Sequence, residues 1–592
     1  MIHPMKRIIL CFDGTSQASN HGREEVPSNV TKLSLSLERW FENDDGGVSP
    51  QIVYYDAGVG TDEVGKVGKD ITVAGLGKTL DQKVCEAYHF IATNYCEGDE
   101  LFFFGFSRGG FTARATAGLI CRVGICAPED LSQFWKMWAM YTKLPPSGEI
   151  RETAWYKAES PEKKGKPFNI KIHGEEKTLY YGEGEEWIDR TQRTVDGLKI
   201  QVVGVWDTVG SLGLPKNQFI DVSRWNEEHQ FYNTEIHPSI KNAFHALALD
   251  EHRMTFSPVL WTLPPGDQKP NLVQCWFPGV HINIGGGSDN KNGDLEFLAN
   301  TTFAWMIDRC SPLLDFNLEA IIGLLSSHSK TVDDILSQYS QASDSQILQA
   351  AKDTRSFWSG GPIVDSFEGP MYKTQGSLVR TPGIYYTDEL TNECIHPIVH
   401  YMQTHSQDYS PKALKGFQRI SYKRGCQDCG FYFNATRTKS TYEPMTTKLK
   451  SRVSKGWSWV TSWVTGNMVN NKIEKYEVRI PEFVIPESVN SRSGDVPGKR
   501  GYMCSVERLL MVVSSNSINQ KAEKERGWTR QMSDESNERL GAYLDDLLKA
   551  NNLLLGPPLY EELPEDYRTS KDWNEVAKLF PQPPLLRIEE SE

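Results

Sequence analysis

The sequence predicts an α/β protein in which helices cover both faces of a mostly parallel sheet. Over the first half of the chain, short apolar segments alternate with segments of helical spacing. Runs such as "LFFF" and "QVVGVW" have no polar face, which is typical of strands buried on both sides. The chain has 592 residues, of which 39% are hydrophobic and 11% aromatic. It can therefore bury a large core, and it exceeds the size of one ordinary domain.

Five strands are expected in this half, and each is followed at once by a polar residue that can do chemistry. Because active residues of open α/β sheets gather at the carboxyl ends of the strands, this repeated position predicts a site at one edge of the sheet. The expected strands are residues 7–12, 51–55, 98–106, 198–206 and 272–280, and the residues that follow them are Asp13, Asp56, Ser107, Asp207 and His281.

Helical spacing predicts helices over residues 76–96, 108–119 and 239–253. The charged stretch 128–194, rich in Trp and Tyr, interrupts the alternation of strands and helices. We expect it to be an insertion near the site, such as a cap.

After residue 310 the alternation weakens, and segments rich in Pro, Gly and Ser replace it. We therefore expect a catalytic domain over residues 1–310 and a mixed C-terminal region of unknown role over residues 311–592. The proline-rich, acidic end of the chain is predicted to be extended or partly disordered.

The segment Gly105-Phe106-Ser107-Arg108-Gly109 matches the G-x-S-x-G pattern of a nucleophile elbow. In that motif a strained turn between a strand and a helix lifts the serine hydroxyl above the sheet, and the two glycines avoid a clash. The match alone is weak, but an expected strand precedes it and an expected helix follows it. The alternative is a tight turn with an inert serine.

A nucleophilic serine needs a base, and the base needs an acid that orients it. Asp207 and His281 follow Ser107 in the chain order of acid and base that hydrolases with this elbow use. Asp207 can also be an ordinary turn residue, and Asp250 is the second candidate for the acid. The rival histidines His245 and His252 flank Asp250 on an expected helix, where a structural role is the more ordinary one.

Stabilisation of an oxyanion requires backbone donors near the serine. The first donor is expected to be the N–H of Arg108, the residue after the nucleophile. The second is expected from the loop after the first strand, where Gly14 lets the backbone approach closely and the N–H of Gly14 or Thr15 can donate. Asp13 would then hold that turn in place.

Other motifs are weaker. In a phosphatase D-x-D-x-T pattern, Cys11 would stand where the nucleophilic aspartate belongs. The segment 75–79 lacks the first glycine of a P-loop, and Cys426 and Cys429 form a lone C-x-x-C without a second pair of zinc ligands. The strand-end acids Asp13, Asp56 and Asp207 leave a metal-assisted phosphoesterase as a distant alternative. We expect no metal and no cofactor.

Composition limits the partners and the compartment. The net charge of −13 argues against nucleic acid, which requires a basic face. The eleven cysteines are an odd number and lie mostly in apolar runs, which indicates free thiols in a reducing compartment. We expect a cytoplasmic protein, because no signal peptide or membrane span is evident. Basic residues before tryptophans in 448–463 can contact a membrane surface or simply pack inward.

Seven motifs occur in one order within residues 6–310: IILCFDGT, NVTKL, YYDAGVGT, FFGFSRGGFTAR, GVWDTVGSLG, HALALDE and WFPGVHINIGGG. Together they resemble an α/β-hydrolase-like family of formerly unknown function. That family is similar to the catalytic domain of class-one phospholipase effectors of bacterial type VI secretion. The resemblance implies an α/β-hydrolase fold, Ser107 as nucleophile, Asp207 as acid and His281 as base. Where many relatives read His-Ser-Asp, this chain has Asn283 at the third position.

The function expected from the sequence is that of a serine hydrolase that cleaves a carboxylic ester through an acyl-enzyme. The substrate would be a small-molecule or lipid ester, and the resemblance points to phospholipids. The alternative of another class is a non-catalytic interaction protein on a hydrolase scaffold. Oligomeric state and the role of the second half are not indicated by any motif.

Overall fold

The computed structural model describes a large part of the chain. The described residues are 5–14, 27–43, 46–58, 73–144, 148, 150–172, 175–185, 187, 198–209, 235–265, 269–287, 296–317, 320–321, 324, 363, 376–383, 390–405, 409–424, 428–442, 471–483, 488–490 and 502–504.

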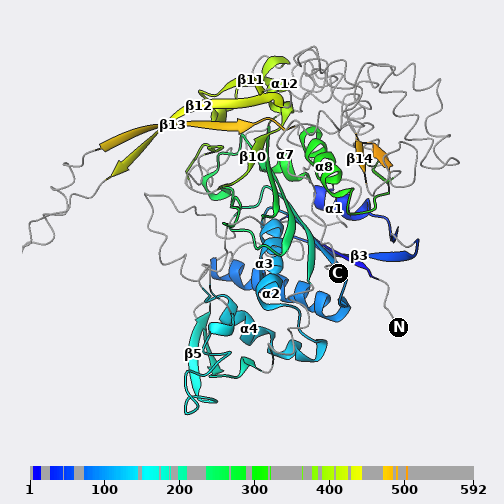
Figure 1. Cartoon of the computed structure of the whole chain (residues 1–592), viewed down its shortest axis with the longest axis vertical. Helices are drawn as coiled ribbons and strands as arrows, with labels where there is room; N and C mark the ends of the chain where they lie inside the picture. The colour runs from blue at the N-terminus through cyan, green and yellow to red at the C-terminus, as the bar shows by residue number, and fades with distance from the viewer. Residues whose placement is uncertain are drawn as a thin grey trace, which may run out of the picture.

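An eight-stranded sheet forms the centre of the molecule, with the order β10-β9-β8-β7-β4-β1-β3-β2 (Figure 1). All neighbouring pairs are parallel except β2 and β3 at one edge. The mostly parallel α/β sheet predicted from the sequence is therefore confirmed. Its strands are β1 (Arg7–Phe12), β2 (Trp40–Glu42), β3 (Val48–Asp56), β4 (Glu100–Phe106), β7 (Lys199–Trp206), β8 (Ile240–Ala248), β9 (Asn271–Phe277) and β10 (Glu393–Ile395).

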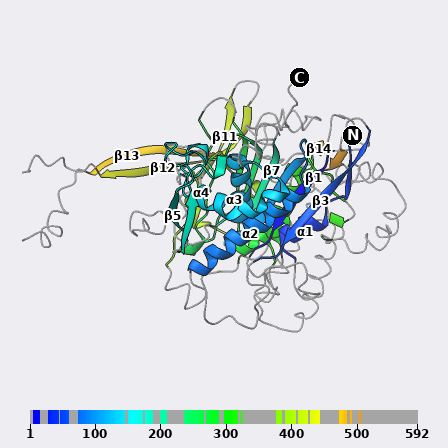
Figure 2. The same ribbon diagram turned by 90° about the horizontal axis from the view of Figure 1, so that it is seen from below.

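Helices pack on both faces of this sheet because successive side chains of its buried strands point to opposite sides. In β1, Ile8 and Leu10 face the core shared with α2 and α3, whereas Ile9 and Cys11 face the core shared with α1 and α8. Figures 1 and 2 show these two layers of helices. The helices are α1 (Asn29–Leu35), α2 (Val73–Asn94), α3 (Arg108–Val123), α4 (Phe134–Tyr141), α7 (His281–Gly285), α8 (Phe297–Cys310) and α12 (Pro397–His405).

The helix predicted over residues 239–253 is wrong, because this segment contains strand β8 in the middle of the sheet. Its alanines and leucine fit helical spacing, yet every residue from Asn242 to Ala248 is buried. A run buried on both faces cannot be assigned to helix or strand from its spacing alone. Pairing with β7 and β9 decides for the strand.

The described part of the expected insertion packs at the far end of α3 from Ser107. It contains α4, two 3₁₀ turns (Pro128–Gln133 and Ile150–Glu152) and the hairpin of β5 (Pro167–Ile172) and β6 (Glu175–Tyr180). A Cβ on Gly118 would lie 3.3 Å from the Tyr141 hydroxyl, which places α4 beside the C-terminal half of α3. This arrangement is visible in Figure 1, where α4 and β5 lie beyond α2.

Residues after 310 contribute to the same sheet, since β10 pairs in parallel with β9. A three-stranded antiparallel sheet of β11 (Gln418–Arg424), β12 (Asp428–Tyr442) and β13 (Asn471–Pro481) shares a buried cluster with α12 and with residues of β8, β9 and β10. A short ladder joins β14 (Ser488–Asn490) and β15 (Tyr502–Cys504). The domain boundary at residue 310 stays a prediction.

Several expectations fall on other parts of the chain. The basic, Trp-rich segment 448–463, Cys426 and the proline-rich end lie outside the described residues. The cysteines that the structure describes as buried or half-buried, such as Cys11, are free thiols. Among the described helices, none is both long enough and apolar enough to cross a membrane.

Candidate active site

Ser107 lies at the sharp turn between β4 and α3, where its backbone has a φ of 57° and a ψ of −122°. A positive φ is unusual for a residue with a Cβ and is concentrated at functional sites. The Ser107 N–H donates to the carbonyl of Trp206 at 3.0 Å, so hydrogen bonding to the neighbouring strand continues through the turn. Ser107 therefore lies in a strained turn between a strand and a helix.

The two glycines of the G-x-S-x-G segment are required by close backbone contacts. A Cβ on Gly105 would lie 2.4 Å from the carbonyl oxygen of Gly109. A Cβ on Gly109 would lie 2.2 Å from the carbonyl oxygen of Phe12, at the end of β1. Both distances are far below van der Waals contact, so a side chain at either position would force the backbone apart.

Ser107, His281 and Asp207 form one hydrogen-bonded array. His281 Nε2 lies 2.7 Å from Ser107 Oγ, although the two residues are 174 positions apart in the chain. His281 Nδ1 lies 2.6 Å from Asp207 Oδ2. All three side chains are buried. With Nδ1 donating to the carboxylate, Nε2 is left to accept the serine proton.

The Asp207 carboxylate is bound on both oxygens. The backbone N–H of Ala248 donates to Oδ1 at 2.9 Å, and the guanidinium of Arg380 donates to Oδ1 at 2.5 Å and to Oδ2 at 2.9 Å. Burial alone would raise the pKa of Asp207, but the charge of Arg380 and the hydrogen bonds from His281 and Arg380 hold it well below its ordinary value. The acid is therefore an anion at neutral pH.

His281 is the first residue of the short helix α7. The sequence predicted a glycine-rich loop after this histidine. Its ring contacts the rings of Phe106 and Phe256, each with a centroid 4.8 Å away. Its backbone N–H donates to Glu251 Oε2 at 3.2 Å. Asn283 Oδ1 accepts from the N–H of Val280 at 2.9 Å, so the Asn283 side chain caps this turn.

The role of Gly14 as an oxyanion donor stays a prediction. The Gly14 N–H donates to Asp13 Oδ1 at 2.7 Å, so in this conformation the amide faces its neighbour's carboxylate. Thr15 lies outside the described residues. Arg108 is the first residue of α3, where backbone amides lack a partner within the helix, and it remains the candidate donor.

Asp13 holds the turn after β1, as the sequence suggested. Its Oδ2 accepts from three hydroxyl groups, those of Ser28 at 2.7 Å, Thr31 at 2.8 Å and Tyr55 at 2.6 Å. These bonds tie β1 to the start of α1 and to β3. Asp13 therefore stabilises the packing of these three elements.

The alternative candidates for the base and the acid, His245, His252 and Asp250, have other hydrogen-bond partners. His245 Nε2 accepts from the N–H of Thr208 at 3.1 Å and Nδ1 contacts Gln274 Oε1 at 3.3 Å, and burial lowers the pKa of His245 to about 3. This histidine is a neutral residue of the core. Asp250 Oδ2 accepts from the N–H of Gly279 at 2.7 Å and from Tyr409 at 3.0 Å, while His252 Nδ1 contacts the Asp250 carbonyl.

A model described as the catalytic domain of Tle1-like phospholipase effectors of the type VI secretion system (T6SS) matches residues 6–309. The chain belongs to this family. Membership of a family of phospholipase effectors supports hydrolase activity in general.

Individual proteins are more distantly related. The uncharacterized protein YEL023C of Saccharomyces cerevisiae is 29% identical over 275 residues, which cover 44% of this chain and 33% of the yeast protein. A structure of the Tle1 effector bound to the VgrG spike is 18% identical, with a TM-score of 0.23, and covers 48% of this chain and 51% of its own. An uncharacterized protein from Pseudomonas aeruginosa is 16% identical, with a TM-score of 0.28 and coverage of 60% and 54%.

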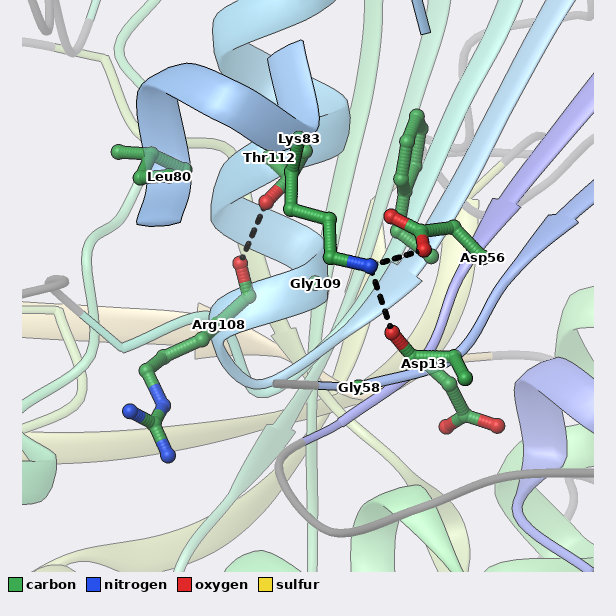
Figure 3. A pocket seen from close by; sticks show the side chains of 10 residues that line it. Asp13, Asp56, Gly58, Leu80, Lys83, Arg108, Gly109 and Thr112 are labelled. Atoms are coloured by element: carbon green, nitrogen blue, oxygen red, sulfur yellow. Dashed lines mark hydrogen bonds and ion pairs between the residues drawn. The ribbon is translucent and has the colours of Figure 1, made fainter. Parts of the chain in front are cut away.

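The three strand-end acids do not converge on one point. Asp56 pairs with Lys83 of α2, which also donates to the Ala57 carbonyl at 3.2 Å (Figure 3). Asp207 is bound by Arg380 and His281. Within the described residues, no three His, Cys, Asp or Glu side chains form a group that could hold a metal ion. Lys83 and Asp56 line a small pocket together with Phe12, Asp13, Ala57, Gly58, Leu80, Arg108, Gly109 and Thr112.

Arg380 is the site residue that the sequence analysis missed. It lies in the region after residue 310, where no motif surrounds it, and a lone arginine gives no signal of its partner. Only the fold shows that its guanidinium reaches Asp207.

Proposed function

We propose that this protein is a serine hydrolase of the α/β-hydrolase type that cleaves carboxylic esters of lipids through an acyl-enzyme. The observation that carries the proposal is the continuous hydrogen-bonded array from Ser107 Oγ through His281 to Asp207. Ser107 is the nucleophile, His281 the general base and then general acid, and Asp207 the residue that orients the imidazole.

The reaction would proceed in two halves. Ser107 Oγ attacks the ester carbonyl while His281 Nε2 takes its proton, and the same nitrogen then protonates the departing alcohol. A water molecule activated by His281 next attacks the acyl-enzyme and releases the acid. The Arg108 N–H would stabilise the oxyanion of each tetrahedral intermediate. Asp207, ionised and buried, stabilises the imidazolium that forms in each half.

The lipid class of the substrate is supported by membership of the phospholipase effector family. The array acts on a carbonyl carbon, so a phospholipid would lose a fatty acid and keep its phosphodiester. The products therefore distinguish this reaction from that of a phosphoesterase.

The first test is covalent labelling of the full-length protein with a fluorophosphonate probe, beside the Ser107→Ala variant. Ser34→Ala is a matched control, because Ser34 is a half-buried serine of α1 whose hydroxyl donates to the Thr31 carbonyl. We expect the wild type and Ser34→Ala to be labelled and Ser107→Ala to stay unlabelled. Vesicles of phosphatidylcholine and phosphatidylglycerol then test for release of fatty acid.

Two results would overturn the proposal. One is a folded wild type that neither reacts with the probe nor releases fatty acid, which would favour the non-catalytic scaffold. The other is hydrolysis that persists in Ser107→Ala, which would place the chemistry at another residue.

A further inference from the structure

Arg380 lies beyond the segment 6–309 that the family model matches, yet it binds the acid of the array. We propose that Arg380 is a positioning residue, which holds the Asp207 carboxylate in the orientation that His281 requires and offsets the negative charge behind the imidazole. The inference rests on the proposed function. It means that the region after residue 310 completes the active site.

The guanidinium is held by four hydrogen bonds, so its place is closely defined. Besides its two bonds to Asp207, Nη1 donates to the Ala248 carbonyl at 2.7 Å and Nη2 donates to the Phe256 carbonyl at 2.8 Å. The side chain is 2% exposed. A planar guanidinium that contacts both carboxylate oxygens fixes the plane of the carboxylate, which the point charge of a lysine cannot do.

The backbone that carries Arg380 is itself bound to the loop after β8. The N–H of Leu378 donates to the His252 carbonyl at 2.9 Å, and the N–H of Met254 donates to the Gly376 carbonyl at 3.1 Å. Further along, the N–H of Gly383 donates to Glu393 Oε2 at 2.8 Å, at the start of β10. The arginine is therefore positioned by the sheet and not by its own flexible stem.

Charge explains why the array needs this residue. Without a cation, a buried carboxylate facing His281 would stabilise the imidazolium strongly and would be costly to ionise. Arg380 shares Asp207 Oδ2 with His281 Nδ1, so it keeps the acid ionised while weakening its pull on the imidazole proton.

The other described charged or titratable groups packed against the array have hydrogen-bond partners of their own. Glu251 accepts from the backbone N–H of His281, and both of its oxygens bind Arg253, at 2.9 and 2.8 Å. His245 behind Asp207 is neutral. Asp250 is bound to Gly279 and Tyr409. Within the part of the chain that the structure describes, Arg380 is thus the Arg or Lys side chain that contacts the Asp207 carboxylate itself.

The test compares Arg380→Gln and Arg380→Lys with Arg419→Gln in the full chain. Arg419 is a matched control, because it makes the same kind of paired contact to buried Glu482, at 2.7 and 2.9 Å, in the antiparallel sheet. The readout is the rate of fluorophosphonate labelling across pH 5–9, normalised to the fraction of Ser107 that is finally labelled. Normalisation separates a damaged site from a smaller amount of folded protein.

For Arg380→Gln we expect the labelling rate at pH 7 to fall on the order of 10²-fold, as for loss of a positioned acid–base group. The rate should fall off at higher pH on the acidic side of the profile than it does in the wild type, because the negative charge of Asp207 is then no longer offset by a cation. Arg380→Lys should keep the acidic side of the pH profile near that of the wild type and should recover part of the labelling rate. Arg419→Gln should change neither the pH profile nor the normalised rate.

A double variant with Asp207→Asn tests whether Arg380 acts through the acid. If it does, Arg380→Gln adds no further loss to Asp207→Asn, whereas independent effects would multiply. If Arg380→Gln does not fold, Arg380→Lys carries the test, and a rate equal to that of the wild type overturns the inference.

The inference and the proposed function fail differently. Wild-type labelling with an unchanged rate and pH profile in Arg380→Gln overturns the role of Arg380 and leaves the serine hydrolase intact. Absence of labelling in the wild type overturns both.

Discussion

Ser107 and Asp207 occupy matching positions on neighbouring parallel strands, each one residue beyond the register pair Phe106–Trp206. Both have a positive φ, 57° and 38° respectively. The N–H of Asp207 donates to the Ala246 carbonyl at 2.7 Å, as that of Ser107 donates to Trp206. Sheet hydrogen bonding therefore extends through both strained residues and places the two side chains where His281 contacts both.

The strain at Ser107 predicts that glycine is tolerated there better than alanine. Because the backbone region that Ser107 occupies costs a residue with a Cβ about 1–3 kcal/mol, Ser107→Gly should be more stable than Ser107→Ala by about 1 kcal/mol. Urea unfolding measures the difference. At Ser34, inside α1, the order should reverse, because glycine is the poorer helix former. Equal stabilities of the two Ser107 variants would contradict the strain argument.

Gly109→Ala is expected to destabilise the protein and to abolish labelling of Ser107. The new Cβ would meet the carbonyl oxygens of Phe12 and Asp13 at 2.2 and 2.4 Å, and neither backbone can move without disturbing β1. The cost should be at least about 1–3 kcal/mol in thermal or urea unfolding. Gly118→Ala in the same helix is the control and should be near neutral, because its Cβ meets only the Tyr141 hydroxyl at 3.3 Å.

Asp207→Asn should lower the rate of Ser107 labelling by about 10³–10⁴-fold, because an amide neither stabilises the imidazolium nor selects the same tautomer. Asp250→Asn is the matched control for the rival acid. It leaves the acceptor for Gly279 in place and should keep the rate within about threefold of the wild type. A larger loss in Asp250→Asn than in Asp207→Asn would reverse the assignment of the acid.

The stability of the protein should depend on pH through Asp250, whose pKa burial raises to about 6 against an ordinary value of 3.8. The contribution of a carboxyl with a raised pKa is fully present below pH 3.8 and is lost as the pH rises through 6. Asp250→Asn should therefore be more stable than the wild type at pH 7, by about 1–3 kcal/mol, and the advantage should vanish near pH 4.

For Glu251→Gln we expect a change in stability of the opposite sign to that of Asp250→Asn. Burial acts to raise the pKa of Glu251, but the hydrogen bonds and charge of Arg253 outweigh it and lower the pKa to about 2. Its contribution is present above the ordinary value of 4.5 and is lost as the pH falls toward 2. This variant should be less stable than the wild type at pH 7, and the deficit should shrink in acid. Parallel curves for the two variants would refute both assignments.

Much of the fold could be predicted because its strands are continuous apolar runs that end at polar residues. The runs before Asp13, Ser107 and Asp207 became β1, β4 and β7. The segment around His245 was mistaken for a helix, because a run buried on both faces looks alike in either conformation. Its neighbours in the sheet, which are distant in the sequence, decide between the two.

The sequence by itself determined the local geometry of the nucleophile turn. Only glycine fits at 105 and 109, and a strand must precede Ser107 while a helix follows it. It also named Asp207 and His281, since parallel strands bring their carboxyl ends to one edge. Both signals are encoded in short segments, which the order of residues can specify.

Only the tertiary structure decided what surrounds these residues. The Gly14 amide turns to Asp13, and Arg380 reaches Asp207 from 173 residues away. A hydrogen bond between distant segments depends on how the whole sheet and its connections pack, and no local pattern specifies it. The contact of Arg380 with Asp207 therefore depends on how residues beyond 310 pack against β8.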